Sequence, residues 1–452
     1  MTTAIPNFHE VRTDAGLTVA ALASITGLEP ARLRDLEGGA IARPDELDAW
    51  ARGFGVRIQD LVGANPQSWP LARLAFRASS DGVKGLEALV EDGSYRVIGD
   101  FLRCVAEVKD LEDPSARASL PALTIPAGWE DAAPWGAARL ASQLRAELGL
   151  SPTEPVSSMV RLLRDELSVV VFFVSPEQLA PTIDAASTNS PRPAVLVNLI
   201  EGQHAWWRTR MSLAHELCHL LLDQDEEAPP SVSPDSRFRS RYQCSRDFAL
   251  VEKRANAFAA HLLAPDAGVR DAVGRLLPSS EDAIVAVSRT FGLGRTSSIN
   301  RLQHVFGLSN STRERMLDRP NRSWNLETVF DETARVGLRD GELLDLAMRA
   351  YVEGRVDAVE VRRCLEIAPT EELPAWDSLP EERRAPVRAV ETQVLSVAGR
   401  FLMEHAEPGL VAVRPTRTDH GWQVQVEGGS SDRSISVSFD YEVEPPHWLT
   451  VA

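Results

Sequence analysis

The chain has 452 residues, of which 44% are hydrophobic and 25% charged, and its formal net charge is −17. This length exceeds what one hydrophobic core usually organises, so several domains are expected. No apolar run reaches the roughly 18 residues that span a bilayer, and the acidic balance argues against broad attraction to nucleic acid, although it leaves room for a local basic patch. The N-terminus lacks a signal-peptide pattern and the four cysteines form no CxxC pair, so we expect a cytoplasmic protein without membrane contact.

The first 65 residues are expected to form five short helices. An amphipathic helix runs from Val19 to Thr26 and ends at Gly27, and a second helix begins near Pro30. Two short helices separated by a glycine-containing turn are typical of a helix-turn-helix motif. The hydrophobic pattern resembles the small helical DNA-binding domain of the XRE type.

The surface of the second helix of this motif is only weakly basic. It carries Arg32 and Arg34 among three carboxylates, and residues 1–63 hold six arginines against nine Asp or Glu residues, a net of −3. In an XRE-type domain this helix would contact base edges and phosphates in the major groove. Arg32 and Arg34 are therefore candidate contacts to DNA or to a protein, and the sequence leaves both partners open.

The remainder of the chain predicts an α+β protein that is mainly helical. Apolar β-type runs at residues 168–174 and 194–198 predict two strands, and alternation of apolar residues near the end of the chain predicts a short antiparallel meander turning at Gly428 and Gly429. The expected domains are 1–65 (XRE-type helix-turn-helix), 66–130 (helical linker), 131–310 (helices with a small sheet), 311–405 (helical) and 406–452 (β appendage).

A helix expected over residues 203–224 carries the pattern His-Glu-Leu-Cys-His in an otherwise apolar stretch. His215 and His219 are four residues apart, so both imidazoles leave one helix face and can bind a single metal ion. Zinc accepts such neutral imidazole nitrogens and tolerates an open position for a hydrolytic water. Glu216 is adjacent and is the candidate catalytic base. The alternative is a pair of surface histidines on a solvated helix, but the apolar neighbours of His215 and His219 argue against it.

A second helix, beginning near Asp247 and ending at Pro265, supplies the candidate third ligand. Glu252 lies on an otherwise apolar stripe, so its carboxylate points into the core, where a buried salt bridge is the alternative to metal binding. Asn256 follows one turn later and could orient a ligand or bind the backbone. His261 lies about half a turn out of phase with Glu252 and is rejected as a ligand.

These two helices resemble the ImmA/IrrE family of metallopeptidases. The likeness rests on RTRMSLAHELCHLLLD, on VEKRANAFAAHLLAP about thirty residues later, and on a preceding strand that ends in Val197 and Asn198, and it covers roughly residues 135–310. The resemblance implies zinc (Zn²⁺) bound by two histidines and a glutamate, a gluzincin-like site, with Glu216 catalytic. It also implies cleavage of a specific repressor, often a helix-turn-helix protein, in stress, mobile-element or phage-defence regulation.

The sequence departs from that family at several positions. Cys218 stands where glycine is common and is interpreted as core filling, and Asp223 stands where a further histidine is often seen and is not a dependable ligand. The Pro- and Ser-rich tract at 226–240 is expected to be a flexible loop rather than a structured element. Tyr242 and His204 are weak candidates for stabilising a transition state.

Three functional hypotheses follow. The first is a zinc endopeptidase of narrow specificity, with extended substrate beside a sheet edge near residues 194–198. The second is a DNA-binding transcriptional regulator whose peptidase-like domain is a sensor or scaffold with little turnover. The third gives the N-terminal domain the role of mimicking the repressor fold of the substrate, so that it docks the substrate or inhibits the enzyme.

Overall fold

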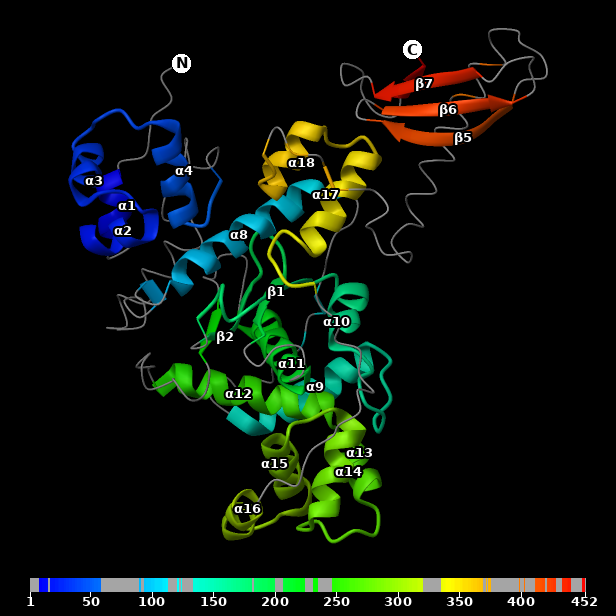
Figure 1. The fold of residues 1–452 in the computed structure, drawn as a ribbon. Helices are drawn as coiled ribbons and strands as arrows, with labels where there is room; N and C mark the ends of the chain where they lie inside the picture. Colours follow the sequence, from blue (N-terminus) through cyan, green and yellow to red (C-terminus); the bar gives the residue numbers. More distant parts are fainter. Residues whose placement is uncertain are drawn as a thin grey trace. The chain divides into compact units, whose positions relative to one another are not determined.

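The computed structural model divides into two compact units, one of residues 1–109 with 114–341 and one of residues 110–113 with 342–452 (Figure 1). Within them the structure describes residues 8–14, 17–57, 89–90, 93–112, 120–121, 123, 133–180, 183–199, 206–223, 231–234, 246–319, 335–368, 371, 373–374, 398, 402, 411–418, 421–427, 433–439 and 449–451. Helices dominate these ranges and the sheets are small, which confirms the expected α+β class with mainly helical content.

Four helices form the described part of the N-terminal region: α1 (Phe8–Asp14), α2 (Val19–Thr26), α3 (Pro30–Glu37) and α4 (Pro44–Gly53). As predicted, α2 ends at Gly27, whose φ of 71° is a left-handed conformation that glycine adopts without strain, and α3 begins at Pro30. The side chains of Leu22, Leu33 and Trp50 are fully buried between the helices. The fifth predicted helix would lie outside the described residues.

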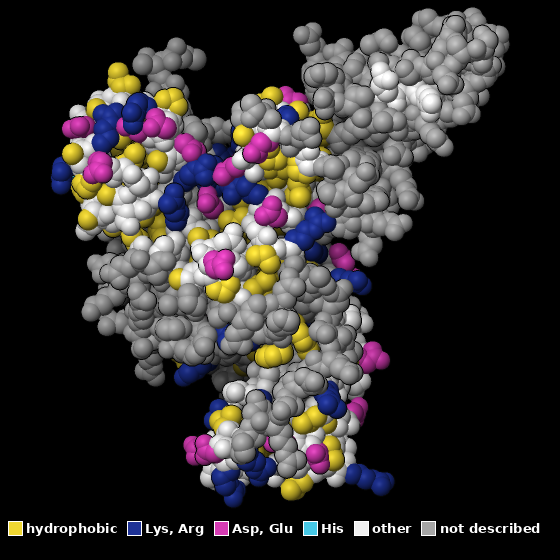
Figure 2. Space-filling model, in the orientation of Figure 1, with side chains coloured by type: hydrophobic (Ala, Val, Ile, Leu, Met, Phe, Trp, Pro, Cys, Tyr) yellow, Lys and Arg dark blue, Asp and Glu magenta, His cyan; other side chains and the backbone are white. Residues whose placement is uncertain are grey.

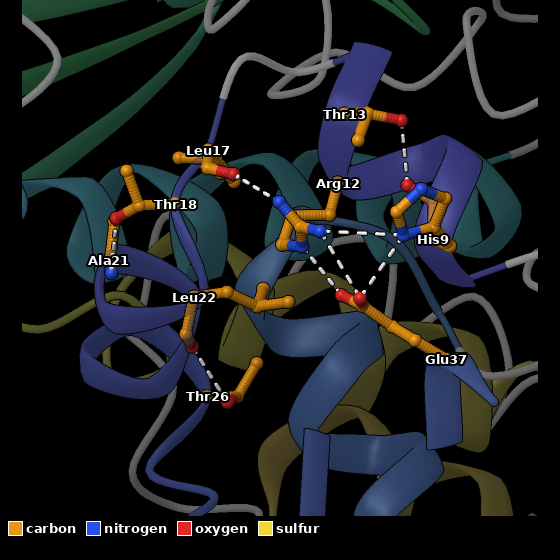
Figure 3. A network of polar contacts seen from close by, with 9 residues as sticks. All are labelled: His9, Arg12, Thr13, Leu17, Thr18, Ala21, Leu22, Thr26 and Glu37. Carbon is orange, nitrogen blue, oxygen red and sulfur yellow. Dashed lines mark hydrogen bonds and ion pairs between the residues drawn. The ribbon is translucent and has the colours of Figure 1, made fainter. Parts of the chain in front are cut away.

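A polar network fixes α1 to the C-terminal end of α3 (Figure 3). The guanidinium of Arg12 donates from Nε to Glu37 Oε1 at 2.5 Å and from Nη2 to Glu37 Oε2 at 3.1 Å. Its Nη1 donates to the backbone oxygen of Leu17 at 2.8 Å, and His9 Nδ1 lies 3.2 Å from Glu37 Oε2. This bidentate contact lowers the pKa of Glu37, because its charged form is held by the guanidinium.

After α8 (Ser94–Leu111) and α9 (Ala133–Glu147), the chain enters a four-stranded sheet. Its strands are β1 (Val170–Val174), β2 (Ile183–Thr188), β3 (Ala194–Asn198) and β4 (Ser231–Pro234), in the order β1-β3-β2-β4. Strand β1 is parallel to β3, while β2 is antiparallel to both β3 and β4.

Two expectations about this sheet are wrong. Residues 194–198 do not lie at a sheet edge, because β3 pairs with β1 on one side and with β2 on the other. The tract at 226–240 is not merely a loop, since β4 lies within it and pairs with β2. Neither β2 nor β4 was predicted; in β2, small residues such as Ala185 and Ala186 have low strand propensity on their own.

The end of β3 is held by a single side chain. The Nδ2 atom of Asn198 lies 3.1 Å from the carbonyl oxygen of Leu179, 3.0 Å from that of Ala180 and 2.9 Å from that of Ile183. Asn198 is 6% exposed, so these contacts are shielded from water. The amide thereby ties the end of β3 to the connection between β1 and β2 through that connection's backbone carbonyls.

Beneath the sheet lie the long helices α11 (Trp206–Leu222) and α12 (Arg246–Leu263). Helix α11 packs on β2 and β3, and α12 packs on α11 and α9 (Figure 1). The short helix α10 (Met159–Arg161) passes at once into a π-helical turn, η2 (Leu162–Glu166). The hydrophobic core around α11 and α12 also includes buried residues of the helices that follow in the chain.

Four helices complete the first unit in the described range: α13 (Asp266–Val273), α14 (Glu281–Phe291), α15 (Arg295–Phe306) and α16 (Asn310–Leu317). The start of α14 is capped by Ser280, and its end by Gly292 in the left-handed conformation. A Cβ atom at Gly268 would overlap the carbonyl oxygen of Thr153 and lie 2.9 Å from Cζ of Phe291. Helix α13 therefore approaches the segment before α10 as closely as glycine allows.

The second unit contains helices α17 (Glu342–Val352) and α18 (Ala358–Leu365) and a separate sheet. The strands β5 (Val411–Thr418), β6 (Gly421–Glu427), β7 (Arg433–Phe439) and β8 (Leu449–Val451) pair antiparallel in that order. The turn predicted at Gly428 and Gly429 lies outside the described residues. No helix in the described ranges is long and apolar enough to cross a bilayer.

Candidate metal centre

The helix α11 carries three ionisable side chains in its buried middle. His215 is 7% exposed, His219 is 1% exposed and Glu216 is fully buried, within a run of buried residues from Leu213 to Leu220. Burying an isolated charge is costly, so such groups need partners that compensate for lost hydration. The partners come from α12 and from the sheet.

Glu252 brings its carboxylate from α12 to both histidines. The two Nε2 atoms of His215 and His219 lie 3.0 Å apart. Glu252 Oε2 lies 3.5 Å from Nε2 of His215, and Oε1 lies 3.3 Å from Nε2 of His219. The carboxylate is 1% exposed. The structure therefore brings the three ligands predicted from sequence to one point, and they are a group that could hold a metal ion.

The spacing of these atoms fits a tetrahedral metal site. Zinc bonds to imidazole nitrogen at about 2.0–2.1 Å, so two ligand atoms at tetrahedral angles lie roughly 3.3 Å apart. The three measured separations, from 3.0 to 3.5 Å, bracket that value. The donor set of two imidazoles and one carboxylate is also one that catalytic zinc uses, with a fourth position left for water or substrate.

Electrostatics favours charge separation in this cluster even without a metal. Burial alone would lower the pKa of His219, but hydrogen bonds with Asp223 and Glu252 raise it to about 10. Burial would raise the pKa of Glu252, whereas hydrogen bonds from His215 and His219 lower it. A metal ion bound at this point would replace the proton of His219 as the positive charge that balances the Glu252 carboxylate.

Glu216 accepts a hydrogen bond from the sheet. The hydroxyl of Ser187 on β2 donates to Glu216 Oε2 at 2.7 Å, and Ser187 is itself fully buried. Glu216 Oε1 is buried and has no hydrogen-bond partner among the described residues. Ser187 thus holds one oxygen of the Glu216 carboxylate, and the other oxygen can accept a proton. Sequence reasoning missed Ser187 because β2 itself was not predicted.

The far side of the His219 ring is held by a carboxylate. Asp223 Oδ2 lies 2.8 Å from His219 Nδ1, and Asp223 Oδ1 accepts a hydrogen bond from Nη2 of Arg254 on α12. Asp223 therefore contacts the ring nitrogen that does not face Glu252. The spacing of four residues from His219 could have indicated this contact. The long side chain of Arg254, two residues after Glu252 on α12, thus reaches the residue that follows α11.

The other candidates from sequence lie elsewhere. Asn256 Nδ2 donates to the backbone oxygen of Glu252 at 2.8 Å, which was one of its two expected roles. Cys218 is fully buried, which raises its pKa and keeps the thiol protonated. Tyr242 and His204 lie outside the described residues.

His261 is part of a separate cluster with Asp266 and His304, in which His261 is buried and the other two residues are exposed. Arg301 enters this cluster: its Nη2 donates to Asp266 Oδ1 at 2.5 Å, and its Nη1 lies 3.3 Å from His261 Nε2. The guanidinium supplies the positive charge that a metal would bring, so we interpret the cluster as structural. Its position supports the rejection of His261 as a ligand beside Glu252.

The two arginines proposed as DNA or protein contacts differ in environment. Arg32 donates from Nε to Glu46 Oε1 at 2.7 Å and from Nη2 to Glu46 Oε2 at 2.8 Å, and the same Nη2 also reaches the backbone oxygen of Ile41. Arg34 is exposed. On the face shown in Figure 2, basic and acidic side chains lie side by side over the N-terminal helices. Most donors of Arg32 are thus engaged within the fold.

A sheet packed on two helices, with two buried histidines and a buried carboxylate between them, defines a candidate metal-dependent domain. The comparison with known families agrees: residues 174–311 match the peptidase M78 model, described as the IrrE N-terminal-like domain. The match includes α11, α12 and the helices through α15. No curated protein matches the chain.

Proposed function

We propose that the chain is a zinc-dependent endopeptidase that cleaves a specific regulatory protein of the repressor type. The observation that carries the proposal is the convergence of three side chains, whose candidate ligand atoms lie within 4.8 Å of one another: His215, His219 and Glu252. The buried carboxylate of Glu216 follows His215 directly in the sequence. The match of residues 174–311 to a peptidase family supports the reaction class. The narrow, repressor-type substrate comes from the sequence resemblance to the ImmA/IrrE family.

Different residues of the centre would bind the metal, transfer the proton and orient the base. His215, His219 and Glu252 would hold zinc, which supplies a Lewis acid that polarises a carbonyl and acidifies water. Glu216 would accept the proton of the attacking water at Oε1 and return it to the leaving amine. Ser187 holds Oε2, so that the proton acceptor keeps one orientation through both transfers.

The sheet suggests where an extended substrate would lie. Among the described strands, β1 and β4 form the two edges. Ser187, which contacts Glu216, is paired with Ser231 on β4, so this edge is one strand away at a spacing of about 4.8 Å. The other edge is separated from β2 by β3. We therefore place the substrate along β4, where it would add a strand to the sheet, and not along residues 194–198.

The test is cleavage of candidate repressors by the full chain. Purified helix-turn-helix repressors are incubated with the wild type, with Glu216→Gln and with Glu166→Gln, an exposed glutamate that serves as control. We expect one discrete cut with the wild type and the control and none with Glu216→Gln. Cleavage by Glu216→Gln at the wild-type rate would contradict the assignment of the base.

Metal analysis tests the centre independently of any substrate. The purified wild type should hold one zinc ion per chain, and Glu252→Gln should lose most of it, because an amide oxygen is a poor zinc ligand. Unchanged zinc in Glu252→Gln would leave Glu252 as a salt-bridge partner of the histidines. It would thereby remove the third ligand from the proposal.

A further inference from the structure

We propose that Asp223 and Arg254 are positioning residues that fix the ring of His219 for metal binding and join the two ligand helices. The proposal rests on the metal centre of the proposed function. It concerns the side of the His219 ring that faces away from Glu252, to which the sequence assigned no role.

The contacts form a continuous chain from the ring to α12. The Nδ1 atom of His219 lies 2.8 Å from Oδ2 of Asp223, and Oδ1 of Asp223 accepts from Nη2 of Arg254. The side chains are 2%, 19% and 13% exposed in that order. Each oxygen of Asp223 has its own donor, so the carboxylate cannot turn without breaking a charge-assisted hydrogen bond.

This arrangement determines which nitrogen of His219 is free for a metal. A carboxylate at Nδ1 keeps the proton on that nitrogen, which leaves the lone pair on Nε2. The Nε2 atom is the one that faces His215 at 3.0 Å and Glu252 at 3.3 Å. Asp223 thus selects the tautomer and the ring orientation that the centre requires.

Arg254 extends the same control to the second helix. It lies two residues after Glu252 on α12, whereas Asp223 follows the last residue of α11. Their ion pair therefore spans the two helices that supply ligands. A shift of α12 relative to α11 would change both the Asp223 contact and the position of the Glu252 carboxylate. The competing explanation is an ordinary ion pair that only stabilises the helix packing.

The first unit offers a closely matched control for that explanation. Arg295 and Glu281 form an ion pair between α15 and α14 whose side chains are 13% and 20% exposed, against 13% and 19% for Arg254 and Asp223. Neither residue of the control pair contacts His215, His219 or Glu252. Removing either carboxylate should lower the stability of the metal-free protein to a similar extent.

The experiment measures zinc affinity of the full chain by competition with a chromophoric chelator, alongside the thermal unfolding of the metal-free protein. We expect Asp223→Ala to weaken zinc binding roughly 10- to 100-fold, the usual range for partners of metal-binding histidines. Arg254→Ala should weaken it less, and Asp223→Asn should restore part of the affinity because its amide oxygen still accepts from Nδ1. Glu281→Ala should bind zinc within twofold of the wild type.

The absorption spectrum of the cobalt-substituted protein gives a second readout. A merely structural ion pair would leave its position and intensity unchanged, whereas a reoriented His219 should alter both. The proposal is overturned if Asp223→Ala binds zinc within twofold of the wild type, or if Glu281→Ala loses as much affinity. A wild type that binds no zinc overturns the metal centre and this proposal together, so the two failures are distinct.

Discussion

Replacing Ser187 with alanine removes the one hydrogen bond that the described residues provide to Glu216. The hydroxyl donates to Oε2 at 2.7 Å, and both side chains are fully buried. Because no bulk water replaces the donor in such a site, the carboxylate loses the contact that fixes its orientation. The Oε1 atom, which we propose as the proton acceptor, then loses its alignment.

The magnitude follows from the type of hydrogen bond that is lost. A hydrogen bond to a charged group contributes about 1.5–3 kcal/mol. If that stabilisation acts on the transition state, kcat falls roughly 10- to 100-fold, since about 1.4 kcal/mol corresponds to a factor of ten. KM should change little, because Ser187 acts on the base and has no proposed contact with substrate. Zinc content should also be unchanged.

The assay is the steady-state cleavage of the repressor substrate by Ser187→Ala and by a control, Ser288→Ala. Ser288 is likewise fully buried, and its hydroxyl lies 2.6 Å from that of Ser298, so it too loses a buried hydrogen bond. The control should lose stability and keep its kcat. A kcat for Ser187→Ala within twofold of the wild type would refute the reasoning, as would an equal loss in Ser288→Ala.

Three further predictions concern the fold. Arg32→Ala should lower the melting temperature of the N-terminal helices because it removes the bidentate partner of the buried Glu46, whereas Arg34→Ala, an exposed change, should leave it unaltered in the same thermal scan. Hydrogen bonds from Arg32 and from the Arg43 backbone lower the pKa of Glu46 from 4.5 to about 2, so this stabilisation is present above pH 4.5 and is lost as the pH falls towards 2. The gap between wild type and Arg32→Ala should therefore close over that range, and a constant gap would contradict the assignment. Gly268→Ala should destabilise the first unit by about 1–3 kcal/mol in denaturant unfolding, because the new methyl group overlaps the Thr153 carbonyl and this outweighs the helix-propensity gain of about 1 kcal/mol. Unchanged or increased stability would show that α13 can move away freely.

The parts of the fold that were predicted from sequence are those with a strong local signal. Capping and turn residues located α2 between Val19 and Gly27, and a continuous apolar run located β3. The helical face shared by His215 and His219 and the apolar stripe around Glu252 sufficed to bring three ligands together. In each case the information lies within about twenty residues of sequence.

The contacts that sequence could not supply depend on pairing between distant segments. Ser187 reaches Glu216 only because β2 lies next to β3, and nothing in an Ala-Ala-Ser-Thr run specifies that neighbour. The inner position of β3 depends on β2 in the same way. Arg254 on α12 reaches Asp223 beside α11, a contact between residues 31 apart in the sequence. Helical phase describes where a side chain starts, and a long side chain can end elsewhere.

Asn198 makes the end of β3 sensitive to the polarity of a single buried side chain. Its amide nitrogen faces three carbonyl oxygens, from Leu179, Ala180 and Ile183. Aspartate has nearly the same size and outline, yet it would turn a shared donor into a negative charge directed at three acceptors. Asn198→Asp would therefore place an unpaired negative charge among these carbonyls. The connection between β1 and β2 consequently depends on the chemistry of one buried amide more than on the volume that it fills.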